Sequence, residues 1–349
     1  MNAVDVHIHW IPDAYLELLS TRSAQPRAQR TDDGWLYIND ARDSFLLEPE
    51  WNDLEIQLET VRGTGMEMTV VSSMGIHSDL DGLPADMARE GARVVNEAWA
   101  GAQRKHPGRF YAAAAVPLQD VDAALLELDH AIGKLGLLGV SIPGSVDGEP
   151  LDSPRLEPFW ARVEQLGVPM FLHPTDGALV SSMRGYDNAL YLSLGRVVDS
   201  SVAAFRLVLS GTFDRHPRLR LLHFHAGGVL PYAAGRLDKN ASIPSLERRP
   251  TDYLRGMWVD TAMPHALTID MALKFYGTDR VLYGSDNPCW NPLAALQATQ
   301  SLELEPETER AVLDANARNL LGLDGSAQTS CGADVVAFLD AGVVRSDQA

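Results

Sequence analysis

The sequence predicts an α/β protein, specifically a (β/α)8 TIM barrel, and three observations lead to this prediction. Eight short apolar runs recur along the 349 residues, with helix-like stretches between them. Several of these runs are nearly continuous hydrophobes rather than alternating, which is typical of strands buried on both faces of a parallel sheet. Regular alternation of eight such strands with helices is the pattern of a closed parallel barrel.

The predicted elements follow one another in a regular order. The apolar runs read, in chain order, AVDVHIH (3–9), EMTVVSS (67–73), FYAAAAV (110–116), LLGVSI (137–142), VPMFLH (168–173), LRLLHFH (219–225), MWVDTA (257–262) and RVLYGSD (280–286). The helix-like segments between and after them are 53–65, 86–106, 121–135, 154–166, 195–215, 265–276 and 307–321. Together these segments predict one barrel domain over residues 1–323.

Three regions of the sequence are additional to the strands and helices of a (β/α)8 barrel. Residues 20–52 form an insertion after the first strand, and residues 174–194 form another after the fifth. Both follow the carboxyl end of a strand, where barrel enzymes have their active sites, so we expect lids or substrate walls; plain surface excursions are the alternative. Residues 324–349 are a C-terminal extension rich in Gly, Ser and Ala with a final apolar stretch, which suggests a peripheral arm or a partner contact.

Composition excludes several classes of protein. A net charge of −18 argues against nucleic-acid binding, because a phosphate backbone would be repelled. The two cysteines, Cys289 and Cys331, are too few for a disulfide framework. Neither a signal peptide nor an apolar run long enough to cross a bilayer is found, so we expect a cytoplasmic protein without membrane partners.

Two histidines stand close together near the N-terminus, in the run VDVHIHW. Side chains alternate faces along a strand, so His7 and His9 point the same way, with Val4, Val6 and Ile8 on the other face. Two imidazoles on one face can bind one cation. The alternative is that one histidine is a satisfied core residue and the other only ends the strand.

Polar residues gather at the carboxyl ends of further predicted strands. His173 ends the fifth strand, His225 the sixth and Asp286 the eighth. Together with the two N-terminal histidines, five such groups converge on one mouth of the barrel, and unpaired buried polar groups are costly. Imidazoles and a carboxylate form a site for a first-row divalent metal, with zinc the leading choice and manganese the alternative.

Several segments, in this order and spacing, resemble the amidohydrolase superfamily. The resemblance covers residues 3–323 and is closest to the branch that contains aminocarboxymuconate semialdehyde decarboxylase and related metal-dependent decarboxylases. The matching pieces are DVHIHWIP, LDSPRLEPFWARVEQLGVPMFLHP, HPRLRLLHFHAGGVLPYAAGRLD, VLYGSDNP and NARNLLGL.

The resemblance implies roles for individual residues. It implies four metal ligands, which are His7, His9, His173 and Asp286. It makes His225 the catalytic acid/base that is not a permanent ligand. Asp286 has an alternative role as a general base beside the metal, as in hydrolytic relatives. His223, two residues before His225 on the same face, lies a layer deeper and is interpreted as structural.

The number of metals follows from a missing lysine. Binuclear amidohydrolases use a carbamylated lysine at the end of the fourth strand to bridge two ions. Here that strand reads GVSIPGS, and the nearest lysine, Lys134, lies before it in a predicted helix. The sequence therefore predicts one divalent ion per chain.

Three residues are candidates for contact with a small-molecule substrate. In decarboxylases of this branch, an arginine that stands eleven residues after the catalytic histidine reaches the active site of a neighbouring subunit. The residue at this position here is Arg236. The alternative is that Arg236 lies on a helix surface and pairs with Asp238 or a nearby acid. The reach into a neighbouring subunit predicts a homodimer or larger homo-oligomer, which the molar mass in solution would test. A further arginine is expected in the first insertion, where this chain has Glu48 and the closest candidate is Arg42. Trp10 could pack on a planar substrate.

The resemblance and the residues together lead to a functional hypothesis. The leading one is a metal-dependent nonoxidative decarboxylase of a small aromatic or unsaturated carboxylic acid; the departure near Glu48 weakens a dicarboxylate muconate as substrate. The alternatives are a hydrolase of an amide, lactone or ester that uses a metal-activated water, or a hydratase. A catalytically retired scaffold would have no reason to retain all five residues together.

Overall fold

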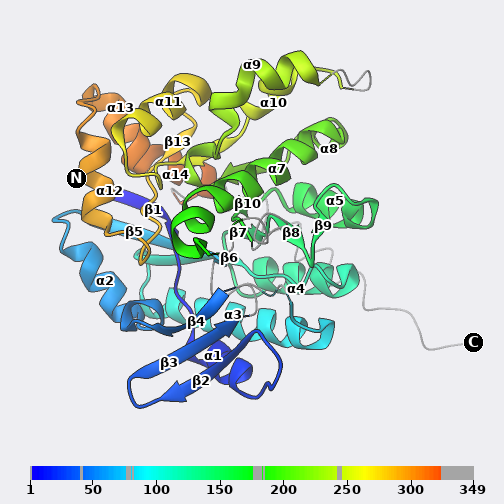
Figure 1. Ribbon diagram of the computed structural model, residues 1–349. Helices are drawn as coiled ribbons and strands as arrows, with labels where there is room; N and C mark the ends of the chain where they lie inside the picture. The colour runs from blue at the N-terminus through cyan, green and yellow to red at the C-terminus, as the bar shows by residue number, and fades with distance from the viewer. Residues whose placement is uncertain are drawn as a thin grey trace, which may run out of the picture.

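The barrel predicted from the apolar runs is present. The computed structural model describes residues 2–39, 42–75, 80, 82–175, 183, 185–241 and 246–323. Eight strands form one sheet in which every neighbouring pair is parallel (Figure 1). In sheet order the strands are β1 (Asn2–Ile8), β5 (Glu67–Ser72), β6 (Phe110–Ala114), β7 (Gly139–Ile142), β10 (Pro169–Leu172), β11 (Arg220–His223), β12 (Trp258–Asp260) and β13 (Val281–Leu282).

The last strand returns to the first, which closes the sheet. The backbone N–H of Val6 donates to the carbonyl of Tyr283 at 3.0 Å, and Ile8 forms a parallel bridge with Asn287. All eight predicted strands overlap observed ones, and the predicted ranges extend beyond most of them at the carboxyl end. The TIM barrel is therefore confirmed, with its polar residues at or just beyond the strand ends.

Helices lie outside the strands (Figure 1). Those within the predicted segments are α2 (Leu54–Arg62), α3 (Ala85–Lys105), α4 (Val121–Gly133), α5 (Glu157–Leu166), α7 (Arg196–Leu209), α8 (Thr212–Arg215), α11 (Ala266–Tyr276), α13 (Pro306–Arg310) and α14 (Asn316–Leu321). The carboxylates of Asp53 and Asp120 accept backbone N–H groups at the starts of α2 and α4, which explains where these two helices begin. The predicted helix 195–215 is divided into α7 and α8 because Gly211 adopts a left-handed φ of 72°.

Further helices were not indicated by the apolar pattern. They are α1 (Asp13–Ser20), α9 (Leu230–Asn240), α10 (Pro250–Leu254) and α12 (Pro292–Gln300). Three of these have a proline in the first turn, where the missing N–H costs nothing and the fixed φ favours the helix. Single turns of 3-10 helix are η1 (Pro49–Trp51), η2 (Pro154–Leu156) and η4 (His225–Gly227), and π-helical segments are η3 (Asp187–Gly195) and η5 (Ala311–Ala315).

The first insertion folds as an antiparallel sheet of its own. Its strands are β2 (Arg27–Thr31), β3 (Gly34–Asn39) and β4 (Arg42–Leu47), and the sheet lies beside α1 at one edge of the molecule (Figure 1). Trp35 is buried and donates its indole N–H to Asp13 at 3.1 Å. A short hairpin, β8 (Ser145–Val146) with β9 (Glu149–Pro150), follows β7.

The second insertion and the C-terminal extension are described only in part or not at all. Of residues 174–194, residues 176–182 and 184 lie outside the described part of the chain, and η3 begins at Asp187. The extension 324–349 lies wholly outside it. Among the helices that the structure describes, none has both the length and the hydropathy to span a bilayer.

One local expectation about β1 is wrong. Regular alternation places Val4, Val6 and Ile8 on one face. Val4 and Val6 belong to the hydrophobic cluster that contains Phe171, whereas Ile8 belongs to a separate cluster with Tyr15 of α1. The register between β1 and β5 shifts between residues 5 and 8, and this irregularity interrupts the alternation.

Candidate metal centre

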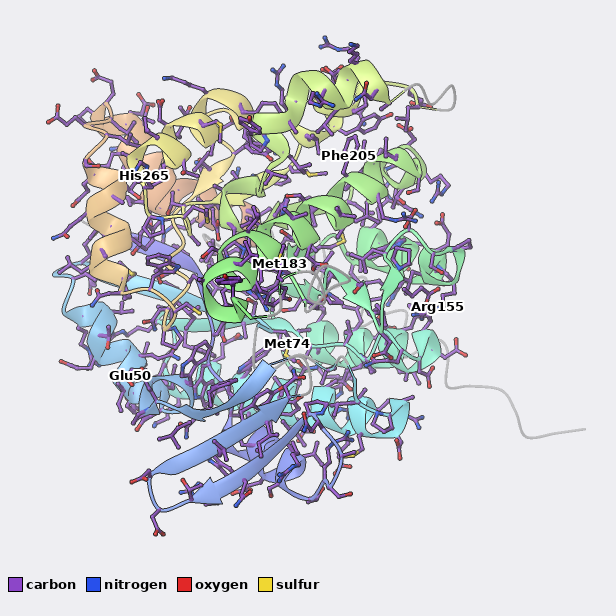
Figure 2. The ribbon with its side chains drawn as sticks, in the orientation of Figure 1. Glu50, Met74, Arg155, Met183, Phe205 and His265 are labelled. Atoms are coloured by element: carbon purple, nitrogen blue, oxygen red, sulfur yellow. The ribbon has the colours of Figure 1, made fainter. Side chains whose placement is uncertain are left out.

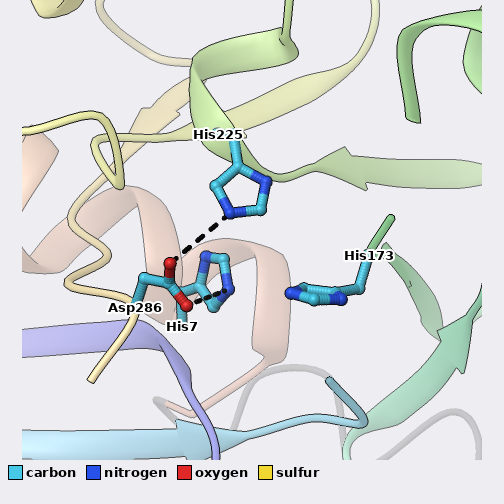
Figure 3. A group of neighbouring side chains, drawn as sticks. All are labelled: His7, His173, His225 and Asp286. Atoms are coloured by element: carbon cyan, nitrogen blue, oxygen red, sulfur yellow. Dashed lines mark ion pairs between the residues drawn. The ribbon is translucent and has the colours of Figure 1, made fainter. Parts of the chain in front are cut away.

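Five polar side chains meet at the carboxyl ends of the strands, as predicted. His7, His173, His225 and Asp286 each offer one ligand atom, and these atoms all lie within 4.8 Å of one another. Figure 3 shows the four side chains pointing toward a common centre. His9 completes the group, because its Nε2 atom lies 3.1 Å from both His7 Nε2 and Asp286 Oδ1.

The Nδ1 side of three imidazoles faces an oxygen that can only accept a hydrogen bond. These contacts are His7 with Asp260 Oδ2 at 2.6 Å, His9 with the Ser73 carbonyl at 3.2 Å and His173 with the Pro174 carbonyl at 3.0 Å. Nδ1 of His7 and Nδ1 of His9 therefore carry a proton, and the Nε2 atoms of these two rings are left with a bare lone pair. Nδ1 of His173 also lies 3.3 Å from the guanidinium of Arg196, which can only donate. Histidines that ligate metals have their outer nitrogen occupied in the same manner.

The inner face of the group consists of acceptors without donors. Asp286 Oδ1 is buried and has no hydrogen-bond donor among the described residues, although His7 Nε2 lies 3.3 Å away. Buried lone pairs that face one another are costly unless a cation lies between them. His7 Nε2, His9 Nε2 and Asp286 Oδ1 lie 3.1–3.3 Å from one another. Ligand atoms that bind one ion at about 2.1 Å are expected to lie about 3.0–3.4 Å apart, so these three atoms match that spacing. The residues therefore fit a divalent metal.

Electrostatics agree with this assignment. Burial lowers the pKa of His7 and holds the pKa of His173 well below its usual value, so both rings are neutral and can donate a lone pair. His7 and His173 are therefore in the form that a metal ligand requires.

His225 lies in a tight turn. Its φ is +57° and that of Ala226 is +55°, and both are left-handed conformations that cost free energy for residues other than glycine. A Cβ atom on Gly227 would lie 2.1 Å from the Tyr276 hydroxyl, and one on Gly228 would lie 2.1 Å from Ser201 Oγ. Only glycine fits these two positions, so the sequence HAGG is required for the turn that presents His225.

The contacts of His225 differ from those of the other histidines. Its Nε2 lies 3.6 Å from Asp286 Oδ2, and its Nδ1 has no partner within the part of the chain that the structure describes. Within the described residues no acceptor fixes the tautomer of His225 from outside, in contrast to His7 and His9. His225 as acid/base rather than permanent ligand stays a prediction. His223 bonds Ser200 Oγ at 3.0 Å and is not a member of the group, which agrees with a structural role.

The Trp10 ring packs outside the metal centre, and its contact with substrate stays a prediction. Its indole N–H donates to the carbonyl of Asn52 at 2.9 Å, and its ring packs edge-on against Phe110 at 5.6 Å. The ring lines a separate cavity that also includes Lys105. Following His9 directly, Trp10 points to the other side of the chain, between the strands and the outer helices.

The two arginines predicted for substrate contact remain predictions. Arg42 is the first residue of β4, and its side chain lies outside the described part of the structure. Arg236 is exposed on α9. Asp238, the acid considered as its partner, accepts hydrogen bonds from Thr251 N at 3.0 Å and Thr251 Oγ1 at 2.7 Å.

Sequence reasoning missed two buried charged residues at the centre. Asp260 bonds His7 and ends the observed strand β12, whereas the predicted run 257–262 continues two residues beyond it. Arg196, the first residue of α7, donates to the Pro174 carbonyl at 2.6 Å. No sequence signal indicates Arg196, since it stands at a helix start after an insertion.

An apolar cavity adjoins the metal centre. Its volume is about 40 Å³, and His173 forms part of its wall. Met74, which Figure 2 shows near the middle of the molecule, lines it together with Leu118, Ile142 and Val146. The side of the centre next to His173 is therefore suited to an apolar group rather than to a charge.

Comparison with known proteins places this geometry in a family. The family model described as amidohydrolase matches residues 4–323, which is most of the chain. The chain belongs to the amidohydrolase family. The resemblance inferred from the sequence motifs is thereby confirmed. A metal-binding group at the carboxyl ends of barrel strands agrees with this membership.

Relatives of this amidohydrolase-family protein have names that specify a reaction. It is 33% identical to a gamma-resorcylate decarboxylase from Rhizobium sp. over 303 residues, which is 79% of this chain and 91% of the relative. It is 27% identical to a 2-amino-3-carboxymuconate-6-semialdehyde decarboxylase from Dictyostelium discoideum, covering 78% and 77% of the two chains. A crystal structure of a 2,6-dihydroxybenzoate decarboxylase from Rhizobium superimposes with a TM-score of 0.77 at 29% identity, covering 93% of this chain and 100% of that one.

Proposed function

We propose that this protein is a metal-dependent decarboxylase that removes carbon dioxide, without oxidation, from a small aromatic or unsaturated carboxylic acid. The observation that carries the proposal is a buried cluster that joins the imidazoles of His7, His9 and His173 to the carboxylate of Asp286, with His225 beside it. Two relatives that span most of the chain are named decarboxylases, one of a dihydroxybenzoate-type acid and one of an unsaturated semialdehyde acid.

His7, His9, His173 and Asp286 would hold one divalent ion, zinc or manganese. When bound, the ion supplies positive charge that orients the oxygen atoms of the substrate and withdraws electron density from it. Asp260 and the two carbonyl acceptors fix the rings of the three histidines, so the ligands are in place before the ion arrives.

His225 is suited to move the proton that the reaction needs. It is buried beside Asp286, and within the described residues no acceptor engages its Nδ1 atom. The imidazolium of His225 would donate a proton to the carbon that bears the carboxylate, forming a C–H bond. The bond between that carbon and the carboxylate then breaks, its electron pair restores the π-system and carbon dioxide leaves.

The metal content of the purified protein is the first expected outcome. We expect about one divalent ion per chain by elemental analysis, because the described ligand atoms enclose one centre and the fourth strand has no lysine to bridge a second. The same measurement identifies the ion as zinc, manganese or another metal. Two ions per chain, or full activity in protein that holds none, would contradict the site.

Solvent isotopes distinguish decarboxylation from the hydrolase and hydratase alternatives, which can use the same five residues. A panel of hydroxylated benzoates and unsaturated acids is incubated in deuterium oxide and, separately, in oxygen-18 water. We expect one deuterium on the carbon that lost carbon dioxide and no heavy oxygen in a new carboxylate or hydroxyl group. Labelled acids or alcohols formed without carbon dioxide would establish water addition instead and refute the proposed function.

A further inference from the structure

Asp260 joins two parts of the metal centre through its two oxygen atoms. Its carboxylate is fully buried at the end of β12. Oδ2 accepts the Nδ1–H of His7 at 2.6 Å, a distance typical of a charge-assisted hydrogen bond. Oδ1 accepts the backbone N–H of Ala226 at 3.0 Å and that of Ala262 at 3.2 Å. One side chain therefore contacts a metal ligand and the residue next to His225.

The backbone that Asp260 contacts is under strain. His225 and Ala226 both adopt a left-handed φ, near +57° and +55°. Such conformations are less favourable than helical or extended ones, and they persist only where the surroundings impose them. The hydrogen bond from the Ala226 N–H to Asp260 stabilises this turn at the residue directly after His225.

The pair of His7 and Asp260 is also enclosed from other sides. The Phe224 ring stacks on the His7 ring at 3.7 Å between centroids and 15° between planes. Gly284 passes so close that a Cβ atom there would lie 3.0 Å from the Cβ atoms of both Asp260 and His7. Phe224 immediately precedes His225, so ring stacking and the carboxylate both connect His7 to the turn that presents His225.

We infer that Asp260 is a positioning residue that fixes the His7 ring for metal binding and, through Ala226, sets the placement of His225. This inference rests on the proposed function for the role of His225. Asp260 is not a member of the group of ligand atoms, and it acts through the two histidines. A carboxylate is required because one oxygen must accept from the imidazole while the other accepts from the backbone.

The variant Asp260→Asn tests this requirement with almost no change in volume. If the amide NH2 group faces His7, the ring must place its proton on Nε2, where the metal would bind. If the NH2 group faces Ala226 instead, it meets two backbone donors and the turn loses its acceptor. Either orientation breaks one of the two contacts.

Metal affinity and cobalt spectra provide readouts that do not depend on turnover. In Asp260→Asn we expect zinc affinity, measured by competition with a chromogenic chelator, to fall about 10–100-fold. We also expect the visible absorption of the cobalt(II)-loaded protein to change. At saturating metal, kcat should remain at least about tenfold below wild type with little change in KM, because His225 is misplaced.

Glu127→Gln is the matched control. Glu127 is a buried carboxylate on α4 that accepts hydrogen bonds from Arg93 and Asn96, between the outer helices. Its loss lowers stability without touching the metal centre, so zinc affinity and the cobalt spectrum should match wild type. Thermal melting of both variants separates lost stability from lost positioning.

Two results would overturn the inference. The first is zinc affinity in Asp260→Asn within twofold of wild type, and the second is a kcat fully restored by excess metal. If the variant does not fold, wild-type protein labelled with 15N-histidine decides by NMR: a strongly downfield Nδ1–H proton on His7 supports the short bond, and its absence refutes it. Metal affinity and tautomer are measured without substrate, so failure here is distinct from failure of the decarboxylase assignment.

Discussion

Replacing His225 with asparagine is expected to lower kcat by about 10²–10⁴-fold while the metal content stays at the wild-type level. His225 is the histidine of the centre whose Nδ1 has no acceptor within the described residues, so no outer contact reserves its Nε2 lone pair for a metal. Loss of this imidazole removes the proton donor and leaves His7, His9, His173 and Asp286 in place. Steady-state kinetics and elemental analysis of the same preparation measure both effects.

His216→Asn is the control for this variant. His216 lies outside the metal centre, where its Nε2 contacts Glu157 Oε1 at 2.9 Å, so turnover should stay within about twofold of wild type. A His225→Asn protein that has lost its metal would show that His225 is a ligand. In that case the proton would have to come from another group, and the role assigned to His225 would be wrong.

His173→Ala is expected to abolish both turnover and stable metal binding. Nδ1 of His173 is engaged by the Pro174 carbonyl at 3.0 Å and by Arg196 at 3.3 Å, so Nε2 is the ring nitrogen available to a metal. Loss of a residue that only hydrogen-bonds to a ligand lowers metal affinity about 10–100-fold. Loss of the ligand atom itself should lower metal affinity by more than that. After dialysis against a chelator, the variant should hold almost no metal, whereas His225→Asn under the same dialysis should hold about one ion per chain.

A thermal melt accompanies this measurement. His173 follows β10 directly and is buried, so its truncation leaves a cavity and lowers the melting temperature in the absence of metal. Excess zinc should stabilise wild-type protein and leave His173→Ala nearly unchanged, because binding to the native state is what raises stability. Wild-type metal content in His173→Ala would remove this histidine from the ligand set.

The metal centre was predictable because its residues follow one simple rule. His173, His225 and Asp286 stand at or just after the ends of apolar runs, and parallel strands in a closed barrel end at the same rim. This rule uses only the positions of residues along the chain, and it does not require the distances between strands. Asp260 was missed because it lies inside the predicted run 257–262 and its partner His7 is 253 positions away, so nothing local marks the pair.

Features that depend on where a side chain points were not predictable in the same way. Trp10 adjoins His9 in sequence, yet its ring packs against Phe110 on the far side of the chain. Val6 and Ile8 separate into different clusters because the register of β1 shifts. The first insertion forms a three-stranded sheet, although no strand was expected between residues 20 and 52.

The sequence by itself determined the barrel, the order of its strands and the five polar residues at its mouth. Continuous apolar runs suit only strands covered on both faces, and the spacing of such runs leaves few topologies open. The tertiary structure decided which nitrogen of His7 and of His9 is free, since Asp260 and Ser73 come to their Nδ1 atoms from other parts of the fold. Proton placement depends on contacts of a few tenths of an ångström between distant segments, and a linear pattern contains no such distances.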